Sequence, residues 1–323
     1  MDEKSWLVIR DWAYAQLKEK KIKTIGVFED VRLMPWSSVY RVKTDQGFFY
    51  LKYVQGQGCY EAPLLQLLES RFEGMVPSLL SYNKELSCFI LRDAGEMLRI
   101  CLMRDGYNID HVKKVFDRYC VIQRTLESDA DLLINLNIPD WRLRNFTNRY
   151  KNFIEDSCFI ADLGVDEQSY KTLISLTPSV HKLCEDIERV GVPETLEHAD
   201  FQDNNILVRD GHFFISDWGD AVISHPFFSL ASFIRSAERN HSISALIKGE
   251  LEQAYLQHWL DRFDEHNLKS VYSRILALQD IKWVMNFYHA TLESGPAAYL
   301  PFKTSLLKSV LDFRGFFNDI RDA

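Results

Sequence analysis

The sequence lacks several features that would place it in other classes of protein. Its six cysteines are scattered without a Cys-x-x-Cys pair, so neither a zinc site nor a disulfide framework is indicated. No stretch approaches the roughly 18 apolar residues that a membrane-spanning helix needs. The charged start Met1-Asp2-Glu3-Lys4 is followed by no apolar run, so we expect no secretory signal. The sequence therefore predicts a cytoplasmic protein without a membrane partner.

The sequence has fewer basic than acidic residues, with 38 Lys and Arg against 46 Asp and Glu and a formal net charge of −8. This balance gives no support to a nucleic-acid partner, which usually needs a basic face. It is compatible with a cationic substrate. With 323 residues and 46% hydrophobic content, the chain is long enough for one large or two modest domains.

The most informative segment is His198-Ala199-Asp200, which is followed by Asn205 and later by Asp217. Phosphoryl transfer needs a carboxylate that orients the attacking hydroxyl and oxygen ligands that fix magnesium. Magnesium takes oxygen ligands at about 2.0 to 2.1 Å, so an amide and a carboxylate oxygen suit it. The spacing predicts a catalytic base at Asp200 and a magnesium site at the other two residues.

A hairpin explains how the two ligands could meet. Residues 206–208 and 213–215 are typical of short strands, and Asp210-Gly211 between them is a strong hairpin signal. Antiparallel pairing places the residue before the first strand beside the residue after the second. We therefore expect Asn205 and Asp217 to be neighbours.

These residues resemble the aminoglycoside phosphotransferase and choline kinase-like family, which has a protein-kinase-like fold. The resemblance covers about residues 31–235. It implies that Asp200 is the catalytic base, that Asn205 and Asp217 hold Mg²⁺, and that His198 braces the loop.

The chain departs from the family at two positions. Ser216 precedes the second metal ligand, where the family more often has an apolar residue. Ser229 stands where many members place an Asp that is structural, so its loss leaves the chemistry unchanged. Asp220 could support the metal region or cap the following segment.

The order of the expected elements predicts two lobes of α+β type, and the resemblance implies that the fold is protein-kinase-like. A nucleotide-binding lobe at 1–92 would combine an antiparallel sheet with a helix, and a mainly helical lobe at 93–323 would bind the substrate. The expected strands are 24–28, 39–44, 48–54 and 88–91, with helices at 5–20 and 61–70. The expected helices of the second lobe are 111–126, 171–190, 242–263 and 270–292.

Lys52 and Glu61 are the candidates for the nucleotide phosphates. A kinase usually pairs a strand lysine with a glutamate on the next helix. Lys52 lies in the strand at 48–54 and Glu61 opens the following helix. A solvated strand lysine and a first-turn helix acid are the simpler interpretations of each residue alone. The downstream motif favours the functional interpretation.

The remaining nucleotide contacts follow from the resemblance only. The turn before the strand at 39–44 has no glycine, and Ser37 and Ser38 are the candidate phosphate contacts. Backbone groups near Leu91 and Asp93 would hold the base of ATP or GTP.

We interpret the chain as a kinase that moves the γ-phosphoryl group of ATP or GTP to a hydroxyl of a small molecule. A protein kinase is disfavoured, because the sequence has no Asp-Phe-Gly or Ala-Pro-Glu. A nucleotide-binding pseudokinase that serves as an interaction module is the alternative from another class. The acceptor is not identified: acidic residues at 250–265 could receive amines, and Trp218, Trp283 and Tyr288 could form a cage for a quaternary amine.

Overall fold

The computed structural model describes residues 3–321, and the chain divides into two compact units. The first unit comprises the residues up to 101 together with 204–219. The second comprises 102–203 and the residues from 220 onward. The boundary between functional lobes after residue 92 stays a prediction. The two compact units divide the chain between residues 101 and 102.

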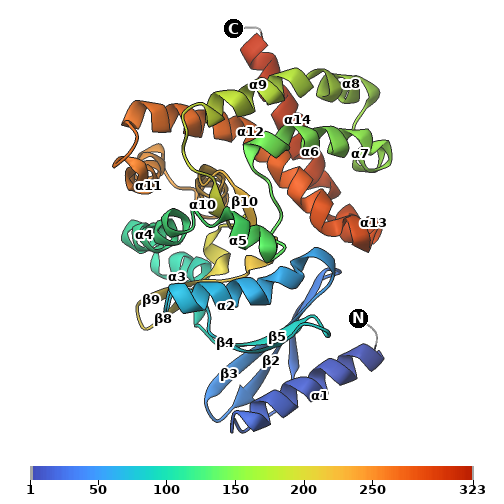
Figure 1. Ribbon diagram of the computed structural model, residues 1–323, viewed down its shortest axis with the longest axis vertical. Helices are drawn as coiled ribbons and strands as arrows, with labels where there is room; N and C mark the ends of the chain where they lie inside the picture. The colour runs from blue at the N-terminus through green and yellow to red at the C-terminus, as the bar shows by residue number, and fades with distance from the viewer. Residues whose placement is uncertain (1–2, 322–323) are drawn as a thin grey trace. The chain divides into compact units, whose positions relative to one another are not determined.

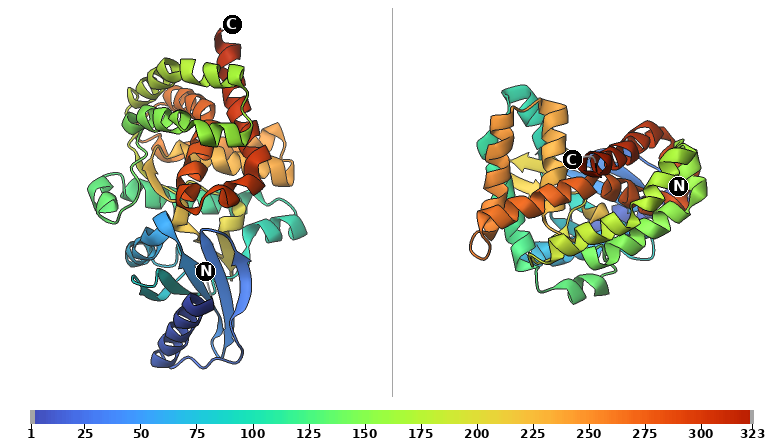
Figure 2. Two further views of the ribbon diagram at one scale, coloured as in Figure 1. Left: turned by 90° about the vertical axis from the view of Figure 1, so that its right-hand side faces the viewer. Right: turned by 90° about the horizontal axis from the view of Figure 1, so that it is seen from above.

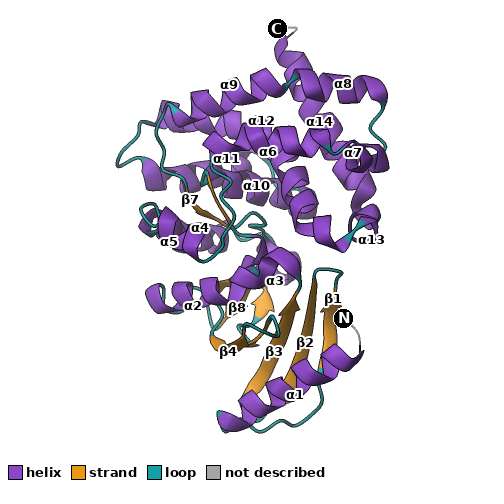
Figure 3. Ribbon diagram, turned by 45° about the vertical axis from the view of Figure 1, so that its right-hand side comes forward, coloured by secondary structure: helices purple, strands orange, loops and turns teal. Residues whose placement is uncertain are grey.

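The first unit is built on a five-stranded antiparallel sheet with the order β1-β2-β3-β5-β4 (Figure 1). Helix α1 crosses one face of this sheet (Figure 3). The strands are β1 (Glu29–Leu33), β2 (Ser37–Thr44), β3 (Gly47–Val54), β4 (Leu79–Asn83) and β5 (Cys88–Arg92), and the helices are α1 (Glu3–Glu19), η1 (Gly56–Tyr60) and α2 (Glu61–Arg71).

The alternation of β3 decides which side of the sheet Lys52 faces. Phe49 and Leu51 are fully buried in the cluster that contains the apolar face of α1. Because successive side chains of a strand point to opposite faces, Lys52 lies on the face away from that cluster. The strand therefore separates a purely apolar face from the face that carries the lysine.

The prediction of a strand at 24–28 is wrong. Within it only Thr24 forms a bridge, to Thr44, and the strand itself is β1. All five residues of β1 are exposed, and a bulge interrupts its pairing between Asp30 and Arg32. An exposed, charged edge strand has no apolar alternation, so its sequence hides it. The predicted strands 39–44, 48–54 and 88–91 are confirmed as β2, β3 and β5.

The predicted hairpin is also confirmed, as part of a three-stranded sheet in the first unit with the order β6-β8-β9. Asp210 and Gly211 have φ of 52° and 76°, the left-handed pair that a two-residue type I′ turn requires. The pairing of Ile206 with Ile215 places Asn205 opposite Ser216, one residue before the position that we expected. The strands are β6 (Glu96–Met97), β8 (Ile206–Arg209) and β9 (His212–Ile215).

The second unit is mainly helical, and α12 is its central helix, packed against α6, α9, α10 and α14 (Figure 2). The short strands β7 (Thr195–Glu197) and β10 (Val222–Ser224) form an antiparallel pair within it. Among residues 3–321, no helix is long and apolar enough to cross a membrane. The helices after β6 are α3 (Leu98–Asp105), α4 (Ile109–Thr125), α5 (Ala130–Asn135), α6 (Leu143–Glu155), α7 (Ser157–Leu163), α8 (Glu167–Ser175), α9 (Thr177–Glu188), η2 (Asp203–Asn205), η3 (Trp218–Asp220), α10 (Phe227–His241), α11 (Ala245–Leu256), η4 (Gln257–Trp259), α12 (Glu265–Thr291), η5 (Leu292–Ser294), α13 (Pro296–Tyr299), η6 (Leu300–Phe302) and α14 (Lys303–Arg321).

Two long helices of the sequence prediction are shorter in the structure. The segment 171–190 is divided between α8 and α9, because Pro178 lies in the first turn of α9 and cannot donate to a preceding helix. The segment 242–263 begins only at α11, after Ser242 has ended α10 with φ of 50°. The mixed α+β class itself is confirmed.

Candidate active site

A buried cation and two carboxylates form the centre of the candidate nucleotide site in the first unit. Lys52 Nζ lies 2.8 Å from both carboxylate oxygens of Glu61 and also contacts the Asp217 carboxylate. Burial opposes the charge on Lys52, but the two carboxylates outweigh it and raise the pKa of Lys52. The predicted pair of strand lysine and helix glutamate is therefore in contact. Asp217, which is 165 positions from Lys52 in the sequence, joins the same lysine.

Asp217 has the properties that a magnesium ligand needs. It follows β9 with φ of 62°, a conformation that non-glycine residues rarely adopt and that often marks a functional position. Its side chain is 41% exposed, so the carboxylate is open to a ligand. Asn205, across the hairpin end, adds an amide oxygen, and oxygen atoms are the ligands that magnesium prefers.

The donor set is small. In the described part of the chain, no group of three or more His, Cys, Asp or Glu side chains is arranged to hold a metal ion. Magnesium usually takes one or two protein carboxylates and completes its shell with phosphate oxygens and water. Asn205 and Asp217 therefore fit a magnesium ion that arrives with a nucleotide, and they do not form a self-sufficient metal cage.

Sequence reasoning missed two residues that support Lys52. Gly219 lies so close that an added Cβ would be 3.0 Å from Glu61 Oε2 and 3.8 Å from Lys52 Nζ. Tyr60 donates a 2.7 Å hydrogen bond from its hydroxyl to the Gly219 carbonyl. The glycine in Asp217-Trp218-Gly219 was the available signal, because a glycine beside a functional carboxylate often permits close approach.

The amide of Asn205 is oriented by its neighbours. Arg99 Nη2 donates to Asn204 Oδ1 at 2.8 Å, and Asn204 Nδ2 donates to Asn205 Oδ1 at 3.0 Å. Asn205 is only 4% exposed. Its side chain is thus held in one orientation within the first unit.

Three of the four residues predicted to contact the phosphates or the nucleobase lie in the sheet, and Asp93 directly follows it. Ser37 and Ser38 open β2, and Ser38 is buried. Leu91 pairs with Tyr50 inside the sheet. Asp93 is engaged with the protein itself, since its carboxylate accepts from the Gly95 N–H at 3.0 Å and forms an ion pair with Arg209 at 2.5 Å.

Asp200 belongs to the second unit, and the chain passes to the first unit between Asp203 and Asn204. The Asp200 carboxylate accepts a hydrogen bond from the Gln202 amide. Asp203 is almost fully buried, where it pairs with His241 and accepts from Ser236 Oγ at 3.3 Å. The loop that carries Asp200 is therefore fixed to α10.

His198 is fully buried. Its backbone N–H donates to the Tyr119 hydroxyl at 2.9 Å. Burial raises the pKa of Tyr119 well above its usual range, so this hydroxyl stays protonated. Asp220 lies in η3 and belongs to the second unit.

The groups considered for a cationic acceptor have local functions. Trp218 is fully buried and donates to the Ile215 carbonyl at 2.9 Å, so it is a core residue. Tyr288 donates to Asp156 at 2.8 Å. Glu250 on α11 pairs with Lys113, and Asp261, in the turn after η4, pairs with Arg124. The acceptor site is not marked by these residues.

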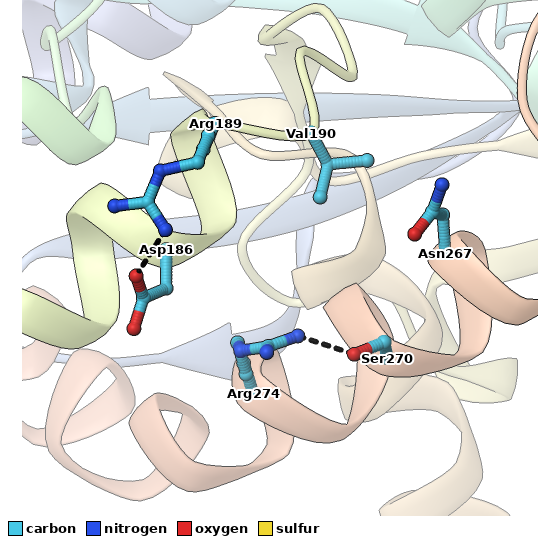
Figure 4. Close-up of a pocket in the computed structure, with 6 residues that line it drawn as sticks. All are labelled: Asp186, Arg189, Val190, Asn267, Ser270 and Arg274. Atoms are coloured by element: carbon cyan, nitrogen blue, oxygen red, sulfur yellow. Dashed lines mark hydrogen bonds and ion pairs between the residues drawn. The ribbon is translucent and has the colours of Figure 1, made fainter.

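Figure 4 shows a surface pocket of the second unit between the end of α9 and the start of α12. Arg189 is paired with Asp186 at 2.8 Å, and Arg274 donates to Ser270. None of the predicted site residues lines this pocket. Its lining is Asp186, Arg189, Val190, Asn267, Ser270 and Arg274.

Comparison with known proteins gives one family and a consistent set of structures. The model of a phosphotransferase enzyme family matches residues 129–270. No curated protein matches the sequence. An ethanolamine kinase from Plasmodium vivax is 14% identical with a TM-score of 0.64, and the alignment covers 89% of this chain and 83% of that one.

Two further structures agree. A choline kinase from Streptococcus pneumoniae is 13% identical with a TM-score of 0.62, covering 94% of this chain and 98% of that one. A thermostable mutant of an aminoglycoside phosphotransferase, in a ternary complex with ADP and hygromycin B, is 14% identical with a TM-score of 0.53, covering 93% and 97%. At these identities the likeness establishes the fold, and the predicted kinase-like α+β architecture is confirmed.

Proposed function

We infer that this chain, whose residues 129–270 match the model of a phosphotransferase enzyme family, is a small-molecule kinase. It transfers the γ-phosphoryl group of ATP or GTP to a hydroxyl. The observation that carries this proposal is the contact of Lys52 with both Glu61 and Asp217 in the first unit. A lysine fixed by a buried glutamate beside a metal-binding aspartate is the arrangement that phosphoryl transfer uses.

On the donor side, Lys52 holds the phosphates and Glu61 keeps its side chain in place. Asn205 and Asp217 supply the protein ligands of magnesium. When bound, the ion neutralises the charge on the phosphates. Ser37 and Ser38 contact the phosphates, and the backbone near Leu91 and Asp93 contacts the base.

On the acceptor side, Asp200 accepts a hydrogen bond from the attacking hydroxyl and orients it. An aspartate carboxylate is too weak a base to deprotonate an alcohol in advance. The proton therefore moves to Asp200 late, while the new oxygen–phosphorus bond forms and the bond to the leaving nucleoside diphosphate breaks. His198 and Asp220 support this loop.

The test is a screen of ATP and GTP consumption with magnesium over ethanolamine, choline, other amino alcohols, aminoglycosides, macrolides and sugars. We expect one acceptor class to be turned over, and Asp200→Ala to lower turnover by about 10³-fold or more while nucleotide binding survives. Asp210→Asn is the matched control, because it changes an aspartate of the same motif in a turn that tolerates Asn. Nucleotide binding without turnover of any acceptor would favour a pseudokinase.

The metal assignment has its own test. Asp217→Ala should lose the magnesium-dependent part of nucleotide affinity, because the carboxylate that anchors the ion is absent. The measurement is a nucleotide titration with and without magnesium. Equal magnesium dependence in the variant and the parent would remove Asp217 from the metal site.

A further inference from the structure

A buried ion pair joins the strand before Asp200 to the central helix of the second unit. Glu197 ends β7, and its Oε2 lies 2.7 Å from Lys282 Nζ on α12. The two side chains are 1% and 5% exposed. Strand β7 packs beside α4 in this unit (Figure 3). A pair so completely removed from water is weak evidence for stability, because desolvation opposes the attraction between the charges.

The second carboxylate oxygen of Glu197 connects the ion pair to the backbone that precedes Asp200. Oε1 accepts hydrogen bonds from the Ala199 N–H and from Ser229 Oγ, both at 2.9 Å. Ala199 has φ of 62°, in the left-handed region that an alanine rarely occupies. Such a conformation costs free energy and persists only where its surroundings impose it. The Glu197 carboxylate is bonded to the N–H of that residue, and Asp200 follows directly.

We propose that Glu197, neutralised by Lys282, is a positioning residue that holds Ala199 in the left-handed conformation and thereby aims the Asp200 carboxylate. This inference rests on the proposed function, in which Asp200 orients the acceptor. Ser229 occupies the position where the resembling family often has a structural Asp. In this chain the buried carboxylate comes from β7 instead of α10, and the serine donates to it.

The neighbouring contacts agree with this assignment. The Tyr119 hydroxyl lies 2.8 Å from Ser229 Oγ and accepts from the His198 N–H, so two successive backbone N–H groups are held by side chains. Lys282 Nζ lies 4.8 Å from the centre of the Phe228 ring, which is a favourable place for a cation. Helices α4, α10 and α12 thus all contribute to the backbone that leads into Asp200.

The experiment separates the charge from the hydrogen-bond acceptor. Removing only Glu197 or only Lys282 would leave an unpaired buried charge and could prevent folding. Two double variants avoid this: Glu197→Gln with Lys282→Met keeps an acceptor for the Ala199 N–H, and Glu197→Leu with Lys282→Met removes it. The first should keep the amide exchange rate of Ala199 close to that of the parent. The second should raise that rate about tenfold, the effect of one lost hydrogen bond.

Glycine at position 199 provides the discriminating control. Glycine reaches the left-handed region without steric cost, so an Ala199→Gly chain should depend much less on the acceptor at 197. We expect the change from Gln to Leu at 197 to lower kcat about 10- to 100-fold when residue 199 is alanine and by only a few fold after Ala199→Gly. Because the glycine background relieves the strain, it also keeps the comparison possible if the alanine variant unfolds.

Hydrogen exchange and turnover answer different questions. Amide exchange at residue 199 is measured without any acceptor substrate. It therefore tests the positioning role even if no substrate is phosphorylated and the proposed kinase function fails. Equal exchange in the two double variants would overturn the role of Glu197. If exchange differs but kcat does not, Glu197 holds the backbone without aiming Asp200, and that part of the proposal is wrong.

Discussion

Lys52 allows the electrostatics of the first unit to be tested quantitatively. In Lys52→Met the cation is lost while the stem is replaced by a side chain of similar length. Glu61, which is 1% exposed, is then left in the interior without a counter-ion. Asp217 also loses its cation, but at 41% exposure it can be solvated by water. The penalty therefore comes mainly from Glu61.

Removing one partner of a buried ion pair costs about 3 to 5 kcal/mol. We expect the lower end, about 3 kcal/mol, because Lys52 is 12% exposed and the pair is not completely dry. Adding Glu61→Leu removes the unpaired charge, so the double variant should recover about 2 kcal/mol of that loss. Nucleotide affinity should not recover, since the double variant still lacks the cation that we propose to hold the phosphates.

Urea unfolding followed by circular dichroism measures the free energy of unfolding, and a nucleotide titration measures the affinity. The two quantities should respond differently to the second substitution: the free energy of unfolding partly returns, and the nucleotide affinity does not. A Lys52→Met protein that unfolds at the same urea concentration as the parent would show that Glu61 is not a buried charge. Recovery of nucleotide binding in the double variant would remove Lys52 from the phosphate site.

Two other predictions follow from single residues. Burial raises the pKa of Glu194 from 4.5 to about 8. The stability that its neutral form provides is therefore complete below about pH 4.5 and is lost as the pH rises through about 8. Glu194→Gln should flatten the fall in the free energy of urea unfolding between about pH 5.5 and 8.5, and an unchanged fall would refute the assignment. Gly219→Ala would place a Cβ 3.0 Å from Glu61 Oε2 and should weaken nucleotide binding about 3- to 10-fold by displacing the Lys52 partner. Gly249→Ala is its control, because nothing lies within 4 Å of that exposed helical glycine and the change should stabilise α11 by about 0.5 to 1 kcal/mol without affecting the nucleotide.

The parts of the fold that were predictable have local causes. The hairpin at Asp210-Gly211 follows from two residues that accept positive φ, and the face of Lys52 follows from the alternation of one strand. β1 was not predictable, because it is an edge strand whose five residues are all exposed and so carry no apolar pattern. The register of the β8–β9 hairpin was predicted to within one residue. The ends of the two strands fix where Asn205 and Asp217 lie, and the sequence shows strand ends only approximately.

The candidate site also has a part that the sequence predicts and a part that it does not. Lys52 and Glu61 are nine positions apart, and a strand followed by a helix suffices to suggest their pairing. Glu197 and Lys282 are 85 positions apart, and each has an ordinary local explanation as a strand end and a helix residue. Only tertiary packing brings them together. The left-handed conformation of Ala199 was equally hidden, because alanine is not a residue that signals positive φ.

In each unit, a lysine–glutamate pair with little exposure lies beside a residue in the left-handed conformation. Lys52 and Glu61 lie at Asp217 in the first unit, and Glu197 with Lys282 lies at Ala199 in the second. Because the two pairs belong to different units and we assign them to different roles, their kinetic effects should separate. Changes at Lys52 should raise the KM for the nucleotide, whereas changes at Glu197 should lower kcat at saturating nucleotide, since the second pair affects only the approach of the acceptor. A combined variant should show both effects at their individual sizes, and a combined loss well below their product would mean that the two pairs act on a single step.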